Sequence, residues 1–510
     1  MITNNQFMER ELIFPPVLEV QTQSRSRVAD WGWWIAAALL PFFVYLQTMA
    51  PTIFGLDSAE LTTGAYTLGI VHPPGSPLYL LLAHLFTWLP VGDVGYRVNL
   101  LSVVSGMIMA AFLFQILRGL TRSRWLALLV TWFCAFSYYI WISTLAAELY
   151  ALQGAWFVGL LWLALRWRAT KQSWLLPLFT FLLGLGLGNH LSLVLLVPGF
   201  AWLLWGKGAE GREQATENGQ QSGVIWLIAA ATGLLGLLIY LYLPLRYLDA
   251  DNLNYARDYW GIDLTTWSGF WWMVSGRIFG SLFLGVSSAK LPGELFTFLH
   301  QLWSNYLGLG ILLGLFGLCA DWRRRPVFHL ALLLMFLAHV SFYLTYKVVD
   351  KQFMFIPAYL IWGIWLGVGA ARVHEWVMHT SLAPVVPLTL GCLVAAAFIL
   401  NYPLTDVSQD WSARERGEAI LTHLPEQAIL YGTWTNIPII EYLQLVETVR
   451  PDVVARNLIF IGRPWATEEV KERLAAGQIV YTTHRNWFTE NTFTFSPVAG
   501  CGCARMTLME

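Results

Sequence analysis

Charged residues are scarce in this sequence. Asp, Glu, Lys and Arg make up 12% of its 510 residues, whereas about 25% is usual for a soluble domain. Hydrophobic residues make up 56% of the chain, a composition that excludes an ordinary soluble globule. Neither sign of charge dominates, because 31 basic residues stand against 32 acidic ones and the net charge is -1. The overall charge therefore gives no reason to expect a nucleic acid as a partner.

Cysteine is also rare, with five residues in the whole chain. This number excludes a scaffold built from disulfides. The chain also lacks the CxxC spacing that a structural zinc site would need. Cys501 and Cys503 form a C-x-C pair, which is a weak signal on its own. The first 30 residues are largely polar and precede an apolar run long enough to span a bilayer, so they do not resemble a cleavable signal peptide. We expect residues 1–30 to be a cytoplasmic N-terminal tail.

Apolar stretches near the length of about 20 residues that a spanning helix needs recur along the chain. They predict an α-helical polytopic membrane protein with about eleven transmembrane helices, at residues 31–50, 97–117, 125–146, 149–166, 174–188, 190–205, 224–245, 302–320, 327–346, 353–371 and 382–401. The segment from Leu78 to Pro90 is apolar but short and bounded by prolines. We expect it to lie in the interface or to re-enter from one side.

The positions of basic residues predict the orientation of these spans. With the N-terminus inside, the clusters at residues 118–124, 166–171 and 323–325 all fall on the cytoplasmic side, and fewer basic residues remain in the outer loops. The sequence therefore predicts a transmembrane domain at 31–402 with its N-terminus cytoplasmic and its C-terminus outside. A multi-pass protein of the bacterial inner membrane, with a periplasmic or exoplasmic tail, is the expected localisation.

After Asn401 the composition changes to a mixture of polar and apolar residues. Strand-like runs at Ala428–Trp434, Val453–Ile461 and Gln478–Thr483 alternate with helical patterns at Ile437–Val449 and Thr467–Ala476. This alternation predicts a small soluble α/β domain at 403–510. The predicted topology places it on the exoplasmic face.

The first outer loop, residues 51–96, carries two acids just before an apolar run. Asp57 and Glu60 are three residues apart, so on a helix that begins here both carboxylates face the same way. Two interpretations fit this spacing. The acids could belong to a functional site, or D-x-x-E could be a capping box in which both acids satisfy helix N–H groups.

Further polar residues gather on the same predicted outer face. Charged groups at or near membrane depth cost several kcal/mol and indicate function by default. A single His or Glu at a helix end is more often solvated or hydrogen-bonded than catalytic, but all of these residues fall on one face. A carboxylate among them could deprotonate an acceptor hydroxyl, and a cation could hold a phosphate leaving group. The residues are His72, Glu148, His190, Arg246, Lys347, Asp350 and Lys351, with several acids between 249 and 263.

The motif Asp57-Ser58-Ala59-Glu60-Leu61, followed by His72-Pro73-Pro74-Gly75-Ser76-Pro77, resembles the signature of the DUF2723 group. This group is related to the TMEM260-like protein O-mannosyltransferases, within the GT-C class of membrane glycosyltransferases. Weaker matches lie at Ala147–Leu152, Gly188–Ser192, Pro244–Arg246, Lys347–Tyr359, Glu441–Gln444 and Val449–Val453. The resemblance covers most of residues 30 to 460.

The resemblance implies a GT-C-like enzyme that passes a sugar from a polyprenyl-phosphate carrier to an acceptor outside the cytoplasm, with inversion. It places the catalytic acid at Asp57 with Glu60 beside it, and a second acid at Glu148. The same resemblance is the basis for assigning substrate-binding roles to the remaining polar residues, with the cations at the phosphate. These are His72, His190, Arg246, Lys347, Asp350 and Lys351.

The expected partners are the lipid-linked sugar donor, a protein or glycan acceptor and the bilayer, without nucleic acid. A divalent cation, Mg²⁺ or Mn²⁺, is a possible cofactor because acid clusters of this type bind such ions. Two alternatives stay open. A lipid-directed glycosyltransferase would modify a membrane lipid, and a transporter would show a hydropathy repeat and polar groups at mid-membrane depth, neither of which the sequence has.

Overall fold

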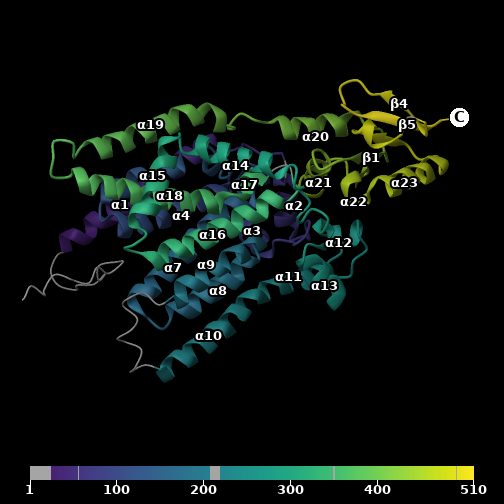
Figure 1. Cartoon of the computed structure of the whole chain (residues 1–510). Coiled ribbons are helices and arrows are strands. Elements are labelled where there is room, and N and C mark those ends of the chain that lie inside the picture. Colours follow the sequence, from purple (N-terminus) through teal and green to yellow (C-terminus); the bar gives the residue numbers. More distant parts are fainter. Residues whose placement is uncertain (1–23, 56, 207–218, 349–350, 490, 510) are drawn as a thin grey trace, which may run out of the picture.

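The computed structural model describes residues 24–55, 57–206, 219–348, 351–489 and 491–509. Long helices run side by side in one body, and a small five-stranded sheet with its own helices lies at one end of that body (Figure 1). A mostly helical membrane protein with a small C-terminal α/β unit, as predicted, is confirmed.

The helical body contains a helix at every predicted apolar stretch. Its elements are α1 (Ser24–Thr48), α2 (Ser58–Thr67), α3 (Pro77–Thr87), α4 (Val94–Thr121), α5 (Arg124–Ala135), α6 (Tyr138–Ile142), α7 (Leu149–Thr170), α8 (Leu175–Leu187), η1 (Leu191–Leu196), α9 (Val197–Trp205), α10 (Gly219–Leu237), η3 (Leu238–Leu241), α11 (Tyr242–Tyr247), α12 (Tyr255–Asp258), α13 (Trp267–Val274), η4 (Arg277–Phe279), α14 (Leu291–Asn305), α15 (Leu309–Asp321), α16 (Pro326–Thr345), α17 (Lys351–Met354), α18 (Ile356–Val377) and α19 (Val385–Thr405).

Several predicted spans are broken, so the count of eleven is not confirmed. Among the described residues, six helices are long and apolar enough to cross a membrane, or seven when α14 and α15, bent by 100° at their junction, count as one span. The predicted span at 125–146 divides into α5 and α6, and the one at 190–205 divides into η1 and α9. Helix α1 begins at Ser24, inside the predicted N-terminal tail, and the first 23 residues lie outside the described part.

Glycines allow some helices of the body to approach closely. A Cβ at Gly317 of α15 would lie 2.1 Å from the carbonyl oxygen of Trp365, and one at Gly369 of α18 would lie 2.0 Å from that of Leu313. Such backbone contact is typical of membrane helices, whose association depends on close packing rather than on the hydrophobic effect.

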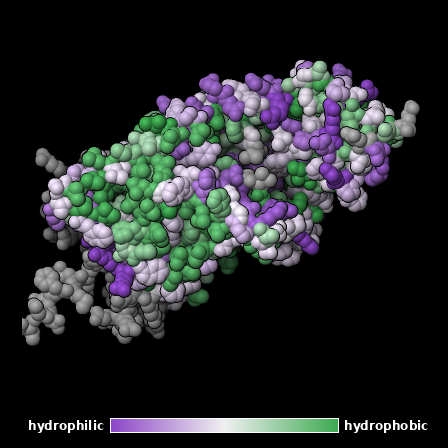
Figure 2. Space-filling model, turned by 45° about the horizontal axis from the view of Figure 1, so that its top comes forward, coloured by the Kyte–Doolittle hydropathy of each residue, from purple (hydrophilic) through white to green (hydrophobic). Residues whose placement is uncertain are grey.

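The helices of the body differ in how much of their apolar surface is buried. Of the apolar window in α18, 89% is buried, against 28% in α19 and 17% in the span Gly223–Tyr247. An apolar helix surface of this length suits contact with lipid. Hydrophobic side chains accordingly cover the helical body, and hydrophilic ones gather at the end that carries the sheet (Figure 2).

The C-terminal unit begins with α20 (Ser412–His423) and continues through β1 (Ile429–Gly432), α21 (Ile437–Leu445), β2 (Val454–Asn457), α22 (Leu458–Ile461), α23 (Arg463–Ala475), β3 (Val480–Thr482), η5 (Arg485–Trp487), β4 (Phe493–Pro497) and β5 (Ala504–Leu508). The strand order is β2-β1-β3-β5-β4, with β1 parallel to both β2 and β3. The predicted alternation of strands and helices is therefore confirmed, because parallel strands need such crossover helices.

Two parts of this unit do not appear in the sequence prediction. Helix α20 leads into the sheet, and strands β4 and β5 add an antiparallel hairpin beside β3. Cys501 and Cys503, in the turn of this hairpin, form a disulfide. The C-x-C pair is thus a bonded pair within one turn.

Candidate active site

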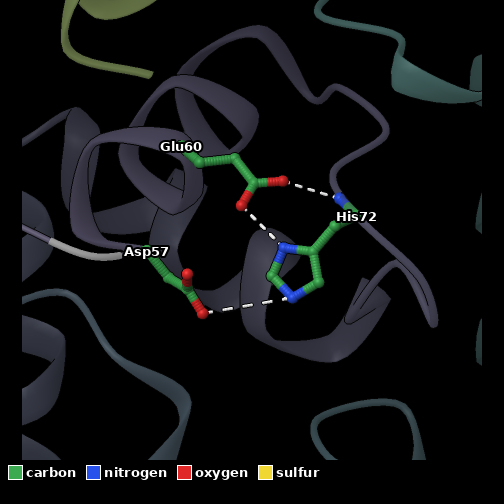
Figure 3. Close-up of side chains that lie close together, drawn as sticks. All are labelled: Asp57, Glu60 and His72. Atoms are coloured by element: carbon green, nitrogen blue, oxygen red, sulfur yellow. Dashed lines mark hydrogen bonds and ion pairs between the residues drawn. The ribbon is translucent and has the colours of Figure 1, made fainter. Parts of the chain in front are cut away.

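Three side chains from the first loop meet where the helical body joins the C-terminal unit. Asp57 precedes α2, Glu60 lies in its first turn, and His72 lies in the loop between α2 and α3. Their three ligand-type atoms all lie within 4.8 Å of one another. Figure 3 shows both carboxylates turned towards the imidazole ring, so the three-residue spacing of the acids places them on one side of α2, as predicted.

Glu60 holds His72 by two contacts. The backbone N–H of His72 donates to Oε1 at 2.6 Å, and the ring atom Nδ1 lies 2.7 Å from Oε2. With Glu60 ionised, its carboxylate can only accept, and Nδ1 then carries the hydrogen of that bond. The second ring nitrogen, Nε2, is thereby left as the basic atom, and it lies 4.0 Å from Oδ2 of Asp57.

The loop that carries His72 is fixed by a distant segment. Ile70 forms a parallel bridge with Asn254, with hydrogen bonds from Ile70 N to Leu253 O and from Tyr255 N to Ile70 O. Since these bonds pair the backbone two residues before His72, the long loop before α12 positions the imidazole.

The capping-box interpretation of the two acids is wrong. Among the described residues, the Asp57 side chain makes no hydrogen bond with the first turn of α2. Glu60 bonds to His72 instead of reaching back to the backbone of residue 57. The carboxylates therefore serve the site rather than the helix end, Asp57 directly and Glu60 through His72.

The three side chains differ in burial and hence in what they can touch. The Glu60 side chain is 0% exposed, that of His72 is 16% exposed and that of Asp57 is 21% exposed. Burial raises the pKa of Glu60, and the adjacent His72 opposes part of this rise. Asp57 and His72 can reach a bound molecule, whereas Glu60 acts through the ring that it holds.

The C-terminal unit contributes a side chain to this site. The sequence did not predict this contribution. The indole Nε1–H of Trp434, in the turn between β1 and α21, donates to Oδ1 of Asp57 at 2.7 Å. The Trp434 ring also stands edge-on to His72, with ring centres 5.4 Å apart. Trp434 falls at the end of a strand-like run, where an aromatic residue looks like part of the core, so the sequence gives no separate signal for it.

A second missed group is a buried acid beside this contact. Glu441 of α21 accepts hydrogen bonds from the hydroxyls of Tyr255 and Tyr259 of the α12 segment. Burial is the main cause that raises its pKa to about 8, and the charge of Glu60 adds to the rise. Its signal in the sequence is a single acid within the otherwise apolar stretch Ile437–Leu443.

Two predicted residues begin neighbouring helices of the body. Glu148 is the residue before α7, and its charge acts on the buried Tyr79 of α3. His190 precedes η1, accepts a hydrogen bond from Ser192 N at 3.2 Å, and lies within electrostatic reach of His72. The Asp57, Glu60 and His72 group does not include either side chain.

Two of the predicted cations, Arg246 and Lys351, already have acidic partners. Arg246 donates through Nε to Leu68 O at 2.8 Å and pairs with Asp249 at 2.7 Å, so it holds the end of α2. Lys351 pairs with Glu294 at 2.7 Å. Lys347 is exposed, and Asp350 lies outside the described residues. The predicted roles of these residues at a phosphate stay predictions.

Asp57 and His72 offer a carboxylate oxygen and a ring nitrogen that fit a divalent cation, and Glu60 supports the ring. With Nδ1 held by Glu60, His72 presents Nε2 next to the Asp57 carboxylate, and a carboxylate on the far ring nitrogen is the usual partner of a metal-binding histidine. An imidazole nitrogen suits a transition-metal ion better than Mg²⁺, which prefers oxygen ligands. The Mg²⁺ or Mn²⁺ ion expected from the sequence stays a prediction.

Comparison with solved structures identifies the fold of the chain. The chain matches the crystal structure of ArnT from Cupriavidus metallidurans in the apo state with a TM-score of 0.53 at 10% identity, over 94% of this chain and 98% of that one. The structure of the same protein bound to undecaprenyl phosphate matches with a TM-score of 0.53 at 12% identity, over 95% and 98%. The chain thus has the fold of the GT-C membrane glycosyltransferases.

Sequence comparison identifies the relatives within that class. Residues 57–213 match the protein O-mannosyl-transferase TMEM260 N-terminal domain. The chain is 24% identical over 83% of its length to protein O-mannosyl-transferase tmem260 of Dictyostelium discoideum, and 28% identical over 80% to TMEM260 of Mus musculus. It spans 56% and 60% of the lengths of these relatives. The resemblance to the TMEM260-like O-mannosyltransferase family, predicted from the first-loop motif, is confirmed.

Proposed function

We propose that this chain is a membrane glycosyltransferase that moves a sugar from a polyprenyl-phosphate carrier to a hydroxyl of a protein or cell-envelope glycan on the outer face of the membrane. The observation that carries the proposal is the convergence of Asp57, Glu60 and His72 at the junction of the helical body and the C-terminal unit. The family match begins at the first of these residues and includes all three.

The relatives support the proposed substrate classes. Those with similar sequences are named protein O-mannosyl-transferases, which supports a protein hydroxyl as acceptor. ArnT, which shares the fold, has a structure with bound undecaprenyl phosphate, which supports a lipid-linked donor. A lipid acceptor is the alternative that the acceptor assay must test.

In the proposed reaction, Asp57 is the general base. Its carboxylate takes the proton of the acceptor hydroxyl while the acceptor oxygen attacks the anomeric carbon. The bond from that carbon to the phosphate oxygen breaks, and the lipid phosphate leaves with the electron pair. Because the attacking and leaving oxygens are on opposite faces of the sugar, the anomeric centre is inverted.

The neighbouring residues position the base and bind the leaving group. Glu60 fixes the His72 ring so that Nε2 faces Asp57. Asp57 and His72 would hold a divalent cation, which when bound would offset the negative charge of the donor phosphate. Arg246, Lys351 and His190 are the proposed contacts of the phosphate. The phosphate would have to compete with Asp249 for Arg246 and with Glu294 for Lys351.

The test is turnover of defined donors by the purified protein. Wild type and Asp57→Asn are incubated with a panel of polyprenyl-phosphate sugars, with peptide, glycan and lipid acceptors, in the presence and absence of EDTA. We expect wild type to consume one donor class with inversion and Asp57→Asn to consume none. Absence of turnover with every donor would refute the proposal, and restored turnover on adding Mn²⁺ after EDTA would support the metal site.

A further inference from the structure

Trp434 connects the C-terminal unit to the proposed base. It comes from the turn after β1, and its contact with Asp57 links residues 377 positions apart in the chain. Among the described residues, this is the hydrogen bond that the Asp57 carboxylate accepts, through Oδ1. The other oxygen, Oδ2, is the one that faces Nε2 of His72.

The direction of the indole N–H is fixed by aromatic packing. The Trp434 ring stands edge-on to His72 at 5.4 Å, to Phe460 at 5.1 Å and to Tyr255 at 6.4 Å. These rings come from three segments: the first loop, α22 and α12. Edge-to-face pairs of this kind are favourable contacts, so they hold the donor in place on the side of Asp57.

A carboxylate held through one oxygen has a fixed rotation about its Cβ–Cγ bond. Without the donor at Oδ1, rotation could exchange the two oxygens or turn both away from His72. The structure thus assigns one oxygen of Asp57 to orientation and leaves the other for chemistry. Preorganised contacts of this kind matter because a displacement of 1 Å in a reacting group can cost about 100-fold in rate.

We propose that Trp434 is a positioning residue for Asp57, so that the orientation of the base depends on the docked C-terminal unit. This inference rests on the proposed function, because it assumes Asp57 to be the base. It gives the C-terminal unit a direct part in the reaction, whichever acceptor is used.

Other contacts hold the unit in place, so changes at Trp434 should not release it. Arg414 of α20 pairs with Asp93 at 3.2 Å, and the Tyr442 hydroxyl accepts from Gly95 N at 3.3 Å. Asn457 N donates to the Tyr259 hydroxyl at 3.1 Å. The interface between the two parts therefore has anchors that are independent of the indole.

The test compares Trp434→Phe with Trp434→His. Phenylalanine keeps an apolar ring but has no N–H, whereas histidine is more polar but restores a ring N–H donor. If Trp434 positions Asp57, Phe should lower kcat about 10- to 100-fold with little change in KM for the donor, and His should recover part of the loss. A packing role would give the reverse order, because the apolar ring packs better.

Trp487→Phe is the matched control. Trp487 belongs to the same unit, but its buried Nε1 has no hydrogen-bond partner among the described residues. The same Trp-to-Phe change therefore removes no donor from a carboxylate. Its kcat should stay within about twofold of wild type, and thermal melting of all variants shows whether each is folded.

A second readout does not depend on turnover. Modification of Asp57 by a carbodiimide, read by peptide mass spectrometry, should increase in Trp434→Phe because Oδ1 is released, and less so in Trp434→His. Unchanged labelling and unchanged kcat in Trp434→Phe, or Phe outperforming His in both, would overturn the inference. If wild type turns over no donor, the proposed function fails by itself, and the order of labelling still decides whether Trp434 holds Asp57.

Discussion

Substitution of Glu60 by glutamine should change the tautomer of His72 while leaving the structure nearly intact. The Glu60 side chain is 0% exposed and accepts two hydrogen bonds from His72, one from the backbone N–H and one from Nδ1. In Glu60→Gln, the amide oxygen must face the backbone N–H, which can only donate. The amide NH₂ then faces Nδ1, which must become an acceptor, and the ring hydrogen moves to Nε2.

The cost in stability should be small. Hydrogen bonds to a charged group contribute about 1.5–3 kcal/mol, and neutral ones contribute about 0.5–1.5 kcal/mol. Two such bonds become neutral, but the burial of a charge, which raises the pKa of Glu60, is removed at the same time. We expect a net loss of no more than about 2 kcal/mol, a change in Tm of a few degrees.

The cost in activity should be large. Nε2 faces Asp57 and, once protonated, can neither accept a proton nor bind a metal. In a serine-protease triad, a change that imposes the wrong histidine tautomer lowers kcat about 10⁴-fold while the geometry stays intact. We expect a loss of about 10²- to 10⁴-fold for Glu60→Gln.

Donor turnover, Mn²⁺ titration and thermal melting of wild type, Glu60→Gln and Glu60→Ala measure these effects. Alanine leaves the His72 donors without an acceptor, so it should lose stability as well as activity. Retention of more than about a tenth of wild-type turnover by Glu60→Gln would refute the assigned tautomer. A large fall in its Tm would refute the claim that glutamine satisfies both donors.

Asp57→Asn should abolish turnover but leave Tm and metal-free donor binding, titrated in EDTA, close to wild type, because without the cation the substitution removes only the base. Arg246→Ala should lower the free energy of unfolding by roughly 1–3 kcal/mol, since it removes the charged donor of the Leu68 and Thr67 carbonyls and leaves Leu68 O only the longer contact with Asn252 at 3.4 Å. It should weaken donor affinity as well, and Arg246→Lys should recover part of both. Folding stability should fall as pH rises from about 4.5 to about 8, because the raised pKa of Glu441 makes the folded state bind a proton that the unfolded chain releases. Melting curves across this range should lose that pH dependence in Glu441→Gln.

Hydropathy predicted where the helices lie but not where they break. The number of apolar residues needed to cross a bilayer is a property of the local sequence, so each stretch was visible. The bend between Asn305 and Leu309 and the break between α5 and α6 occur inside apolar sequence. At the bend, Leu307 and Gly308 have positive φ, and at the break Ser137 begins α6. A single Gly or Ser inside an apolar run does not by itself end a span, so the span count could not be read from composition.

The same distinction applies to the site: residues related by local spacing were predicted, and residues brought in by tertiary contacts were not. Asp57 and Glu60 were predicted to share a side because helical spacing is local. The same spacing also fits a capping box, and only the position of His72 distinguished the two interpretations. Trp434 and Tyr255 reach the site through tertiary docking, and an aromatic residue in an apolar run has no pattern that separates a site from a core. Glu441 did carry a signal, because an acid inside an apolar stretch is rarely buried without a partner.

The disulfide at the C-terminal unit leads to a prediction about orientation. Disulfides persist in oxidising compartments, outside the cytoplasm, and the contact of Trp434 with Asp57 ties this unit to the first loop. Both should therefore face the outside, as the distribution of basic residues predicts. With Cys134, Cys319 and Cys392 replaced, Glu468→Cys on the exposed face of α23 should react with an impermeant maleimide in intact cells. Arg323→Cys, in the loop before α16, should react only after permeabilisation, and the opposite pattern would contradict both the orientation and an outward-facing active site.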